Sequence, residues 1–228
     1  ISKRWTKSYK KEILNSRVDT ANLLYKYVEK LKPKLKFFIS ASGTAYYGQI
    51  TSDKIFTEND APHNDFLGSI CVDWENAAYQ FQDFDARVVC LRTSLVLAKQ
   101  GEGFKLLKKP IQMGVGANLG DGKQWLPWIH LDDLVQMYVD AVENSTINGS
   151  YNASSPEMIN HTTFNHILAK KLNKPFFMPN IPSFMMRLVL GEMSDLVLKG
   201  SRIDPAKIEK TGFRFKYPTL EKAFEELL

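Results

Sequence analysis

Two apolar-rich runs, each preceded by an amphipathic helix, constrain the fold of this chain more than any other feature. The runs, residues 35–39 and 87–97, have the character of strands buried on both faces. Residues 7–32 and 65–81 repeat apolar side chains at helical spacing, with Asp65 placed to cap the second helix. Helix, strand, helix, strand at these spacings predicts an α/β architecture with a parallel sheet.

The first run changes abruptly into small and hydroxylated residues, Ser40-Ala41-Ser42-Gly43, followed by Tyr46-Tyr47-Gly48. Ligands of doubly wound sheets bind where the carboxyl ends of parallel strands open into a crevice. Small residues let a flat ligand lie against the backbone, and the serines and tyrosines supply hydrogen-bonding groups. We therefore expect a ligand site at this strand end; a turn without a ligand is the alternative.

The rest of the chain has shorter elements. The loop after Gly48 is polar, and glycines punctuate a loop-rich region beyond Ala98. Strands are expected over residues 124–129 and 151–153, and helices over residues 131–143, 162–172, 183–199, 205–210 and 219–228.

Composition excludes several classes of protein. The 228 residues are 24% charged with a net charge of +5, spread along the chain, which favours an anionic small molecule over nucleic acid as a partner. Cys71 and Cys90 are expected to be buried thiols of a reducing compartment, and no apolar stretch reaches the roughly 18 residues that a membrane helix needs. His161 and His166 are five residues apart, which does not suit a shared metal site on one helix face. We expect a cytoplasmic protein without a metal.

A Gly-rich turn that could bind a pyrophosphate is missing from the sequence. Such a turn joins a strand to a helix, so that backbone amides can approach the phosphates. The nearest imitation, residues 114–120, has the wrong spacing and follows no β run. We interpret it as a loop.

The strand end and several later motifs resemble a known family in chain order. Ser40-Ala41-Ser42 with Tyr46-Tyr47-Gly48 is similar to the serine strand end of extended short-chain dehydrogenases/reductases. More specifically, the chain resembles the atypical, YfcH-type epimerase family proteins, which are NAD-dependent epimerase/dehydratase superfamily members with a C-terminal DUF1731 segment. The residues that carry the resemblance are Arg4-Trp5, Lys11-Glu12-Ile13, Ser16-Arg17, Thr20, Ser42 to Gly48, Asp65-Phe66-Leu67, Trp74-Glu75, Arg92, Val96-Leu97, Leu119 to Trp125, Trp128 to Leu134, Tyr151-Asn152, Pro156, Leu190-Gly191-Glu192, Gly212 to Phe215 and Tyr217-Pro218.

The resemblance implies a Rossmann-like sheet whose first strands and Gly-rich turn are missing from this chain. Residues 1–100 would be the remaining part of the dinucleotide-binding domain. Residues 101–228 would be a smaller, mostly helical substrate-side region, with a DUF1731-like segment over residues 180–228.

The resemblance also implies which residues bind and react. Cofactor contacts fall on Glu12, Arg17, Ser40, Ala41, Arg92 and Val96, with NADP(H) preferred and NAD(H) as the alternative. Ser42, Tyr46 and Tyr47 are the candidate catalytic residues, and Glu75, Trp125 and Trp128 are candidates for the substrate pocket. For His130 and Asp133, a structural role is the alternative to catalysis.

One departure from the wider superfamily concerns the Tyr-x-x-x-Lys pair, whose positions are occupied by Leu67 and Cys71. A leucine cannot transfer a proton, and a neutral cysteine cannot lower the pKa of a tyrosine as a lysine does. Tyr46, Tyr47 or a carboxylate such as Glu75 would have to replace the missing acid/base.

Two functions therefore remain open. The first is an NADP(H)- or NAD(H)-dependent oxidoreductase or nucleotide-sugar-epimerase-like enzyme, acting on a carbonyl compound or a nucleotide sugar. The second is a dinucleotide-binding sensor or interaction protein without robust catalysis, which the lost Tyr-x-x-x-Lys pair favours.

Overall fold

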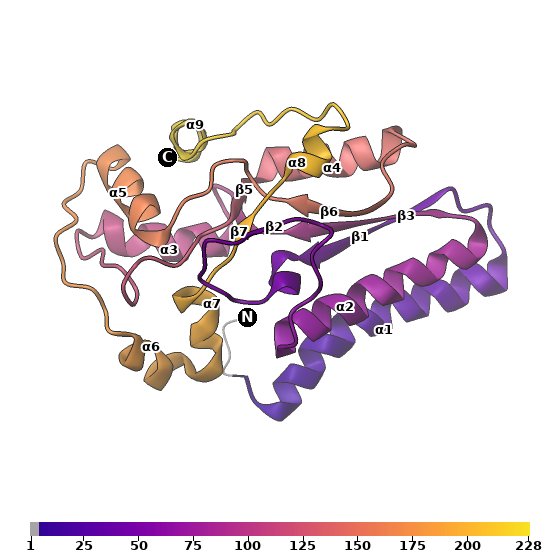
Figure 1. Cartoon of the computed structure of the whole chain (residues 1–228), viewed down its shortest axis with the longest axis horizontal. Coiled ribbons are helices and arrows are strands. Elements are labelled where there is room, and N and C mark those ends of the chain that lie inside the picture. Colours follow the sequence, from indigo (N-terminus) through magenta and orange to yellow (C-terminus); the bar gives the residue numbers. More distant parts are fainter. Residues whose placement is uncertain (1–4) are drawn as a thin grey trace.

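A parallel sheet of three strands, β1 (Phe37–Gly43), β3 (Arg87–Thr93) and β6 (Gly149–Ala153), lies at the centre of the computed structural model, which describes residues 5–228 (Figure 1). The strand order is β1-β3-β6, and both pairs are parallel. The predicted α/β class with a parallel sheet is confirmed. Arg4, one of the residues that carry the resemblance, lies outside the described residues.

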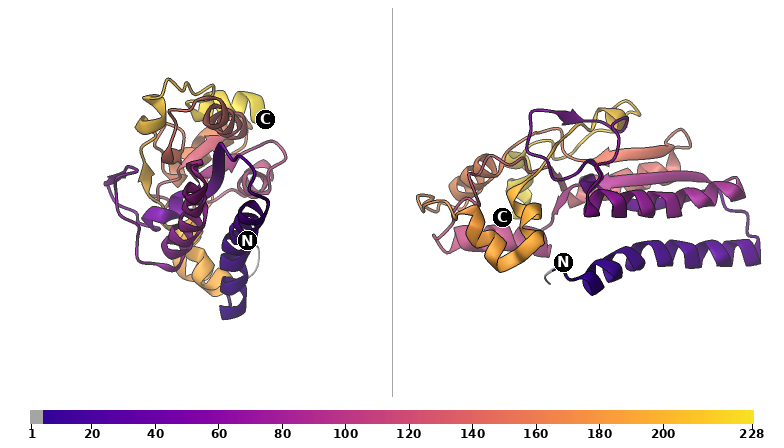
Figure 2. Two further views of the ribbon diagram at one scale, coloured as in Figure 1. Left: turned by 90° about the vertical axis from the view of Figure 1, so that its right-hand side faces the viewer. Right: turned by 60° about the horizontal axis from the view of Figure 1, so that its bottom comes forward.

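Helices cover both faces of this sheet. On one face lie α1 (Lys7–Leu31) and α2 (Phe66–Tyr79), which run side by side (Figures 1 and 2). The other face is covered by α4 (Leu131–Glu143), whose side chains Leu134 and Met137 pack in one core cluster with Val89 and Leu91 of β3. This three-layer arrangement buries the sheet on both sides, as its apolar runs require.

The face toward α2 changes character along the strands. Because side chains alternate between faces, every second residue of each strand points to the same helix. Near the start of the strands these residues are apolar, and Phe38 and Val88 pack with Phe81. Near the carboxyl ends they are polar, with Ser42 in register with Arg92 and Arg92 in register with Asn152. The sheet therefore presents a buried polar row to α2 at the edge where ligands of such folds bind.

The remaining elements build a second core and the C-terminal part of the chain. The strands are β2 (Ile55–Phe56), β4 (Leu95–Leu97), β5 (Trp128–His130) and β7 (Arg202–Ile203); the helices are α3 (Glu102–Gln112), α5 (His161–Lys171), α6 (Ser183–Leu190), α7 (Asp195–Leu198), α8 (Ala206–Glu209) and α9 (Leu220–Leu227), with 3-10 turns at Thr44–Tyr47, Gln80–Phe84 and Gly191–Ser194. Pairs β4–β5 and β2–β7 each form a two-stranded parallel sheet. Phe104, Phe164 and Phe224 join α3, α5 and α9 in the second core. No helix within residues 5–228 is long and apolar enough to cross a membrane.

Several expected element boundaries were wrong. The first strand continues through Gly43, because its small residues pair with β3 as far as Thr93. The second strand breaks at Ser94, whose N–H and hydroxyl both bond to Ala153 O, so that β4 pairs with β5 instead. The expected strand over 124–129 is Trp128–His130, and the helix expected over 183–199 is interrupted at Gly191, where φ is 61°.

Three elements were missed altogether: α3, β2 and β7. The loop-rich region after Ala98 contains α3, which buries Phe104 and Ile111 and carries Pro110 near its C-terminal end. The polar loop after Gly48 contains β2, which pairs with β7 from nearly 150 residues later. Strand β6 lies beyond residue 100 and completes the sheet of β1 and β3, so the sheet takes strands from both sides of the expected boundary at residue 100. The division of the chain into two regions stays a prediction.

We predict that His161 makes the stability of the fold depend on pH. Its ring is buried at the start of α5, and burial lowers its pKa from 6.5 to about 4. A histidine with a depressed folded-state pKa contributes stability above its unfolded pKa and loses it as pH falls toward the folded one. Between pH 7 and pH 5 this group should lower the free energy of unfolding by about 2 kcal/mol.

The measurement is urea unfolding at both pH values for the wild type, His161→Gln and the matched control His166→Gln, whose ring is exposed. His161→Gln should remove about that much of the difference between the two pH values, and His166→Gln should leave it in place. An unchanged pH difference in His161→Gln would contradict the prediction.

Candidate functional site

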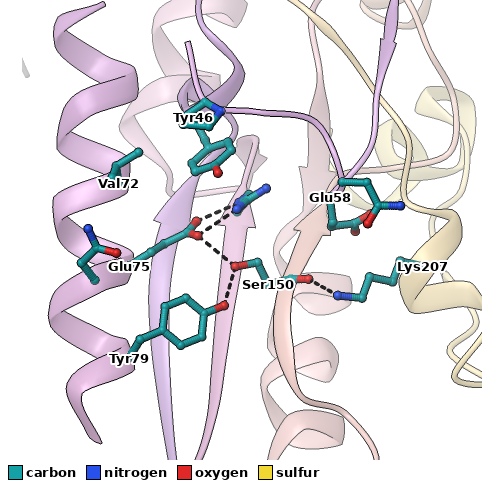
Figure 3. A pocket seen from close by; sticks show the side chains of 11 residues that line it. Tyr46, Glu58, Val72, Glu75, Tyr79, Ser150 and Lys207 are labelled. Atoms are coloured by element: carbon teal, nitrogen blue, oxygen red, sulfur yellow. Dashed lines mark hydrogen bonds and ion pairs between the residues drawn. The ribbon is translucent and has the colours of Figure 1, made fainter. Parts of the chain in front are cut away.

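The carboxylate of Glu75, on the inner face of α2, joins all three strands of the central sheet. One oxygen accepts from Ser42 Oγ of β1 at 2.8 Å and from Arg92 Nε of β3 at 2.8 Å. The other accepts from Arg92 Nη2 at 2.9 Å and from Ser150 Oγ of β6 at 2.9 Å (Figure 3). Glu75 and Arg92 are each 4% exposed. A buried carboxylate is tolerated because a bidentate guanidinium and two hydroxyls occupy its oxygens.

Arg92 extends this network to Tyr47. Its Nη1 donates to the Tyr47 hydroxyl at 2.9 Å, and that hydroxyl donates to Asn152 Oδ1 at 2.7 Å. Tyr47 is 1% exposed, and burial raises the pKa of its phenol well above the ordinary value. Tyr47 is thus a fixed hydrogen-bonding link between strand ends.

Tyr46 differs from its neighbour. Its ring lies against the Arg92 guanidinium, with Cζ 3.4 Å from the ring centroid. Among the described residues its hydroxyl has no hydrogen-bond partner, and the hydroxyl end of the ring points into the pocket that Figure 3 shows. Tyr46 is therefore the phenol of the strand end that a ligand can reach.

The pocket is a polar cavity of about 330 Å³ beside α2. It is lined by Tyr46, Glu58, Asn59, Pro62, Val72, Glu75, Asn76, Tyr79, Arg92, Ser150 and Lys207. The volume is at the lower end for small-molecule sites, and the lining is richer in polar groups than most. No group of three or more His, Cys, Asp or Glu residues placed to hold a metal ion occurs in the part of the chain that the structure describes.

The expected cofactor contacts fall into two groups. Arg17 lies over the Trp74 ring at 5.1 Å from its centroid, donates to Ile13 O and influences the Cys71 thiol through its charge. Glu12 is exposed on α1 and makes no hydrogen bond or ion pair with Arg17. Near the strand ends, Ser40 is buried with its hydroxyl bonded to Ala41 O, and Val96 packs on the core that α4 covers.

Arg92 was also an expected cofactor contact, and its guanidinium is occupied elsewhere. Three of its nitrogens donate to Glu75 and Tyr47. In this geometry Arg92 orders the strand ends and presents Tyr46, rather than offering a free charge to a phosphate.

Leu67 and Cys71, at the positions of the missing Tyr-x-x-x-Lys pair, lie on α2, and the Cys71 side chain lies beside Gly43 at the end of β1. Cys71 is buried, and a Cβ added at Gly43 would be 3.6 Å from its sulfur. Burial raises the pKa of the Cys71 thiol to about 11, so the thiol is protonated near neutral pH. Cys71 is therefore a packed thiol and no substitute for a lysine.

The two tryptophans expected in a substrate pocket do not line it. Trp128 is fully buried in the second core. Trp125 donates from Nε1 to Ser52 O at 2.9 Å and stacks with Arg202, which joins the loop after Gly48 to β7. Both side chains hold elements together.

His130 and Asp133 have structural roles here. His130 Nδ1 caps α4 by accepting from Asp132 N, and its Nε2 lies 3.1 Å from Glu226. The Asp133 carboxylate accepts from Lys216 N at 2.7 Å and Tyr217 N at 3.0 Å, which fastens the C-terminal segment to α4.

The sequence alone did not identify Lys207, Glu58, Asn59, Ser150 and Tyr79 as pocket residues. Ser150 could have been found from the sheet register, because it lies opposite Cys90 on the face toward α2. No local sequence pattern identifies Lys207 and Glu58 as pocket residues. They line the pocket because β2 and β7, two short strands far apart in the chain, pair with each other.

Known proteins show the same arrangement of elements. The model of the NAD dependent epimerase/dehydratase family matches residues 1–154, and that of DUF1731, a domain of unknown function, matches residues 181–227. The chain belongs to the NAD-dependent epimerase/dehydratase family. This confirms the resemblance, including its C-terminal DUF1731 segment.

Individual members of the family are similar over the whole chain. Epimerase family protein SAR0825 of Staphylococcus aureus is 34% identical over 100% of this chain and 76% of its own length. The crystal structure of human epimerase family protein SDR39U1 with NADPH superposes with a TM-score of 0.92 at 29% identity, over 99% of this chain and 76% of that one. A nucleoside-diphosphate sugar epimerase from Corynebacterium glutamicum gives a TM-score of 0.79 at 29% identity, over 100% of this chain and 45% of that one. The Rossmann-like fold of the family is thereby confirmed for this chain.

We predict that the Glu75–Arg92 pair is essential to the stability of this family member. Glu75→Gln leaves a buried guanidinium without its counter-charge and should lower the free energy of unfolding by about 3–5 kcal/mol. The double variant Glu75→Gln/Arg92→Met removes the stranded charge and should recover part of that loss, measured by urea unfolding at pH 7.

The matched control is Asp195→Asn, which breaks the half-exposed pair with Lys199 and should cost less than about 1 kcal/mol. If Glu75→Gln proves no more costly than this control, the carboxylate does not hold the strand ends together.

Proposed function

We propose that the protein is an NADP(H)- or NAD(H)-dependent oxidoreductase or epimerase that acts on a small molecule bearing a carbonyl or a hydroxyl group. The observation that carries the proposal is the similarity over nearly the whole chain to the human family member solved with NADPH. NADP(H) is the expected cofactor on the same ground, with NAD(H) as the alternative. A carbonyl compound or a nucleotide sugar is the expected substrate.

The residues present suit one end of a dinucleotide. Arg17, held over Trp74 near the end of β1, can contact a phosphate or stack on a base. The small residues Ser40, Ala41 and Gly43 let a nicotinamide lie against the strand end. The described residues contain no Gly-rich strand-to-helix turn that could bind the pyrophosphate. When bound, the nicotinamide supplies hydride exchange.

Tyr46 is the best placed residue to move a proton to or from the substrate. It is the reachable phenol of the strand end, and Arg92 fixes its ring. Tyr47 is buried and bonded on both sides, which leaves it a positioning role. Ser42 is buried and donates to Glu75, so its hydroxyl oxygen keeps its capacity to accept a hydrogen bond.

A dinucleotide-binding sensor or interaction protein without robust turnover is the second candidate. The positions of the proton-transferring pair hold Leu67 and a Cys71 thiol whose raised pKa keeps it neutral. If Tyr46 does not act in place of this pair, the site can bind a cofactor without using it.

The experiment measures cofactor binding and turnover in the natural protein that contains these 228 residues. NADPH and NADH are titrated by fluorescence, and nicotinamide absorbance is then followed with panels of carbonyl compounds and nucleotide sugars. Tyr46→Phe should lower turnover by about 10²–10⁴-fold while leaving cofactor affinity unchanged.

The control is Tyr27→Phe, whose ring is exposed on α1 and lies outside the pocket. Turnover that survives in Tyr46→Phe would remove this residue from the mechanism. Tight cofactor binding without turnover, unchanged in Ser42→Ala and Tyr46→Phe, would favour the sensor.

The 228-residue chain by itself should bind NADPH more weakly than micromolar, because it lacks the Gly-rich turn.

A further inference from the structure

The DUF1731 segment contributes a charged residue to the pocket beside α2. Strands β2 and β7 are parallel, with Ile55 opposite Arg202 and Phe56 opposite Ile203. Since parallel strands end at the same edge, the residues that follow them emerge side by side. Glu58 follows β2, Lys207 follows β7, and both line the pocket (Figure 3).

Backbone bonds fix where Lys207 stands. Asp204 N donates to Phe56 O, Asp204 O accepts from Asn152 Nδ2, and the Asp204 side chain accepts from Ala206 N. These bonds join the start of α8 to β2 and to the end of β6. Lys207 is therefore held at the pocket by the same strand ends that hold the Glu75 network.

The ammonium of Lys207 has one hydrogen-bond partner and no counter-ion in the part of the chain that the structure describes. Nζ donates to Ser150 O at 2.6 Å and lies over the Tyr151 ring, 4.2 Å from its centroid. None of the ion pairs of the described residues includes it. An ammonium carries three donors, so two remain for a ligand.

The other cation of the pocket is already committed. Arg92 donates three of its five N–H groups to Glu75 and Tyr47, and the Glu75 carboxylate neutralises its charge, which leaves Lys207 as the cation without a counter-ion among the lining residues. Partial burial lowers the pKa of Lys207, and nearby Glu58 raises it. Its reduced hydration strengthens the attraction between the ammonium and an anion.

The remaining lining groups suit hydroxyl groups. The side-chain amides of Asn59 and Asn76 face the pocket without a hydrogen-bond partner among residues 5–228, as does the hydroxyl of Tyr46. Glu58 accepts from Asn152 N through one oxygen. Amides, a phenol and a carboxylate around a small cavity match the donors and acceptors of a polyhydroxylated molecule.

We propose that Lys207 binds an anionic group of the substrate, a carboxylate or a phosphate carried by a small polyhydroxylated molecule. This names the substrate class of the site and rests on the proposed function. It gives the DUF1731 segment a role in substrate selection, because Lys207 of its α8 would bind an anionic substrate more tightly than a neutral substrate.

The test compares three probes of one framework, glucuronate, glucose 6-phosphate and glucose, by isothermal titration and NMR with no cofactor added. The two anionic probes should bind at least about tenfold more tightly than glucose, as expected of a hydrogen bond between charged groups. The tighter of the two identifies carboxylate or phosphate as the preferred group. Lys207→Met should abolish the preference, and Lys207→Arg should restore part of it.

The matched control is Lys210→Met, which removes an exposed lysine just after α8 and should keep the preference. Thermal unfolding of each variant verifies that the fold is retained. Equal binding of the three probes, no binding of any probe, or a preference that survives in folded Lys207→Met overturns the proposal. Because no cofactor is present, these outcomes are independent of the NADPH titration that tests the function.

Discussion

The ion pair between Glu75 and Arg92 is the interaction on which the rest of the site depends. Bringing these two charges out of water costs several kcal/mol for each ion, and their attraction offsets this only if every remaining hydrogen-bonding position is filled. Ser42 of β1 and Ser150 of β6 donate to the carboxylate beside Arg92 of β3, and Tyr47 accepts from Arg92. One residue from each strand is thereby committed to a single carboxylate, and the carboxyl ends of the sheet are held in one arrangement.

This arrangement determines which groups are left for a ligand. The hydroxyl of Tyr47 is hydrogen-bonded to Arg92. Tyr46, one residue earlier, stacks on the guanidinium of Arg92, and its hydroxyl lies in the pocket. Of the two adjacent tyrosines, Tyr47 therefore orders the strand ends, and Tyr46 presents a hydroxyl that a ligand can reach. A site that has lost the Tyr-x-x-x-Lys pair retains a rigid frame in which one phenol is accessible.

Much of the fold could be predicted from the sequence, because its signals are local. Periodicity placed α1 and α2, and Asp65 caps α2 by accepting from Gly68 N. Ser42, Tyr46 and Tyr47 were found from the pattern at the end of the first strand, Glu75 and Arg92 were implied by the family resemblance, and the structure brings the five together. The sequence could not show that Arg92 pairs with Glu75. That pairing depends on how α2 packs against β3, and the two residues are 17 positions apart in the chain.

Features that rest on long-range pairing were out of reach. Strands β2 and β7 have two residues each, too few for any alternation to be visible, and they pair although nearly 150 residues separate them in the sequence.

Helix α3 was missed for a local reason, because glycines surround it and Pro110 lies within it, although its buried Phe104 and Ile111 are seven residues apart on one face. Trp128, an expected substrate-pocket residue near a strand end, packs in the second core.

The β2–β7 pair has a consequence for how the chain tolerates change in length. Residues 51–54 between Gly48 and β2 are mostly exposed, but their backbone is tied to distant elements, since Ser52 O accepts from Trp125 Nε1 and Asp53 O accepts from Arg202 Nη1. An added residue between Phe56 and Glu58, or between Ile203 and Lys207, would displace one charge of the pocket relative to the other. The two short spacings, of two residues from Phe56 to Glu58 and of four residues from Ile203 to Lys207, therefore set how far apart these two charges stand in the pocket.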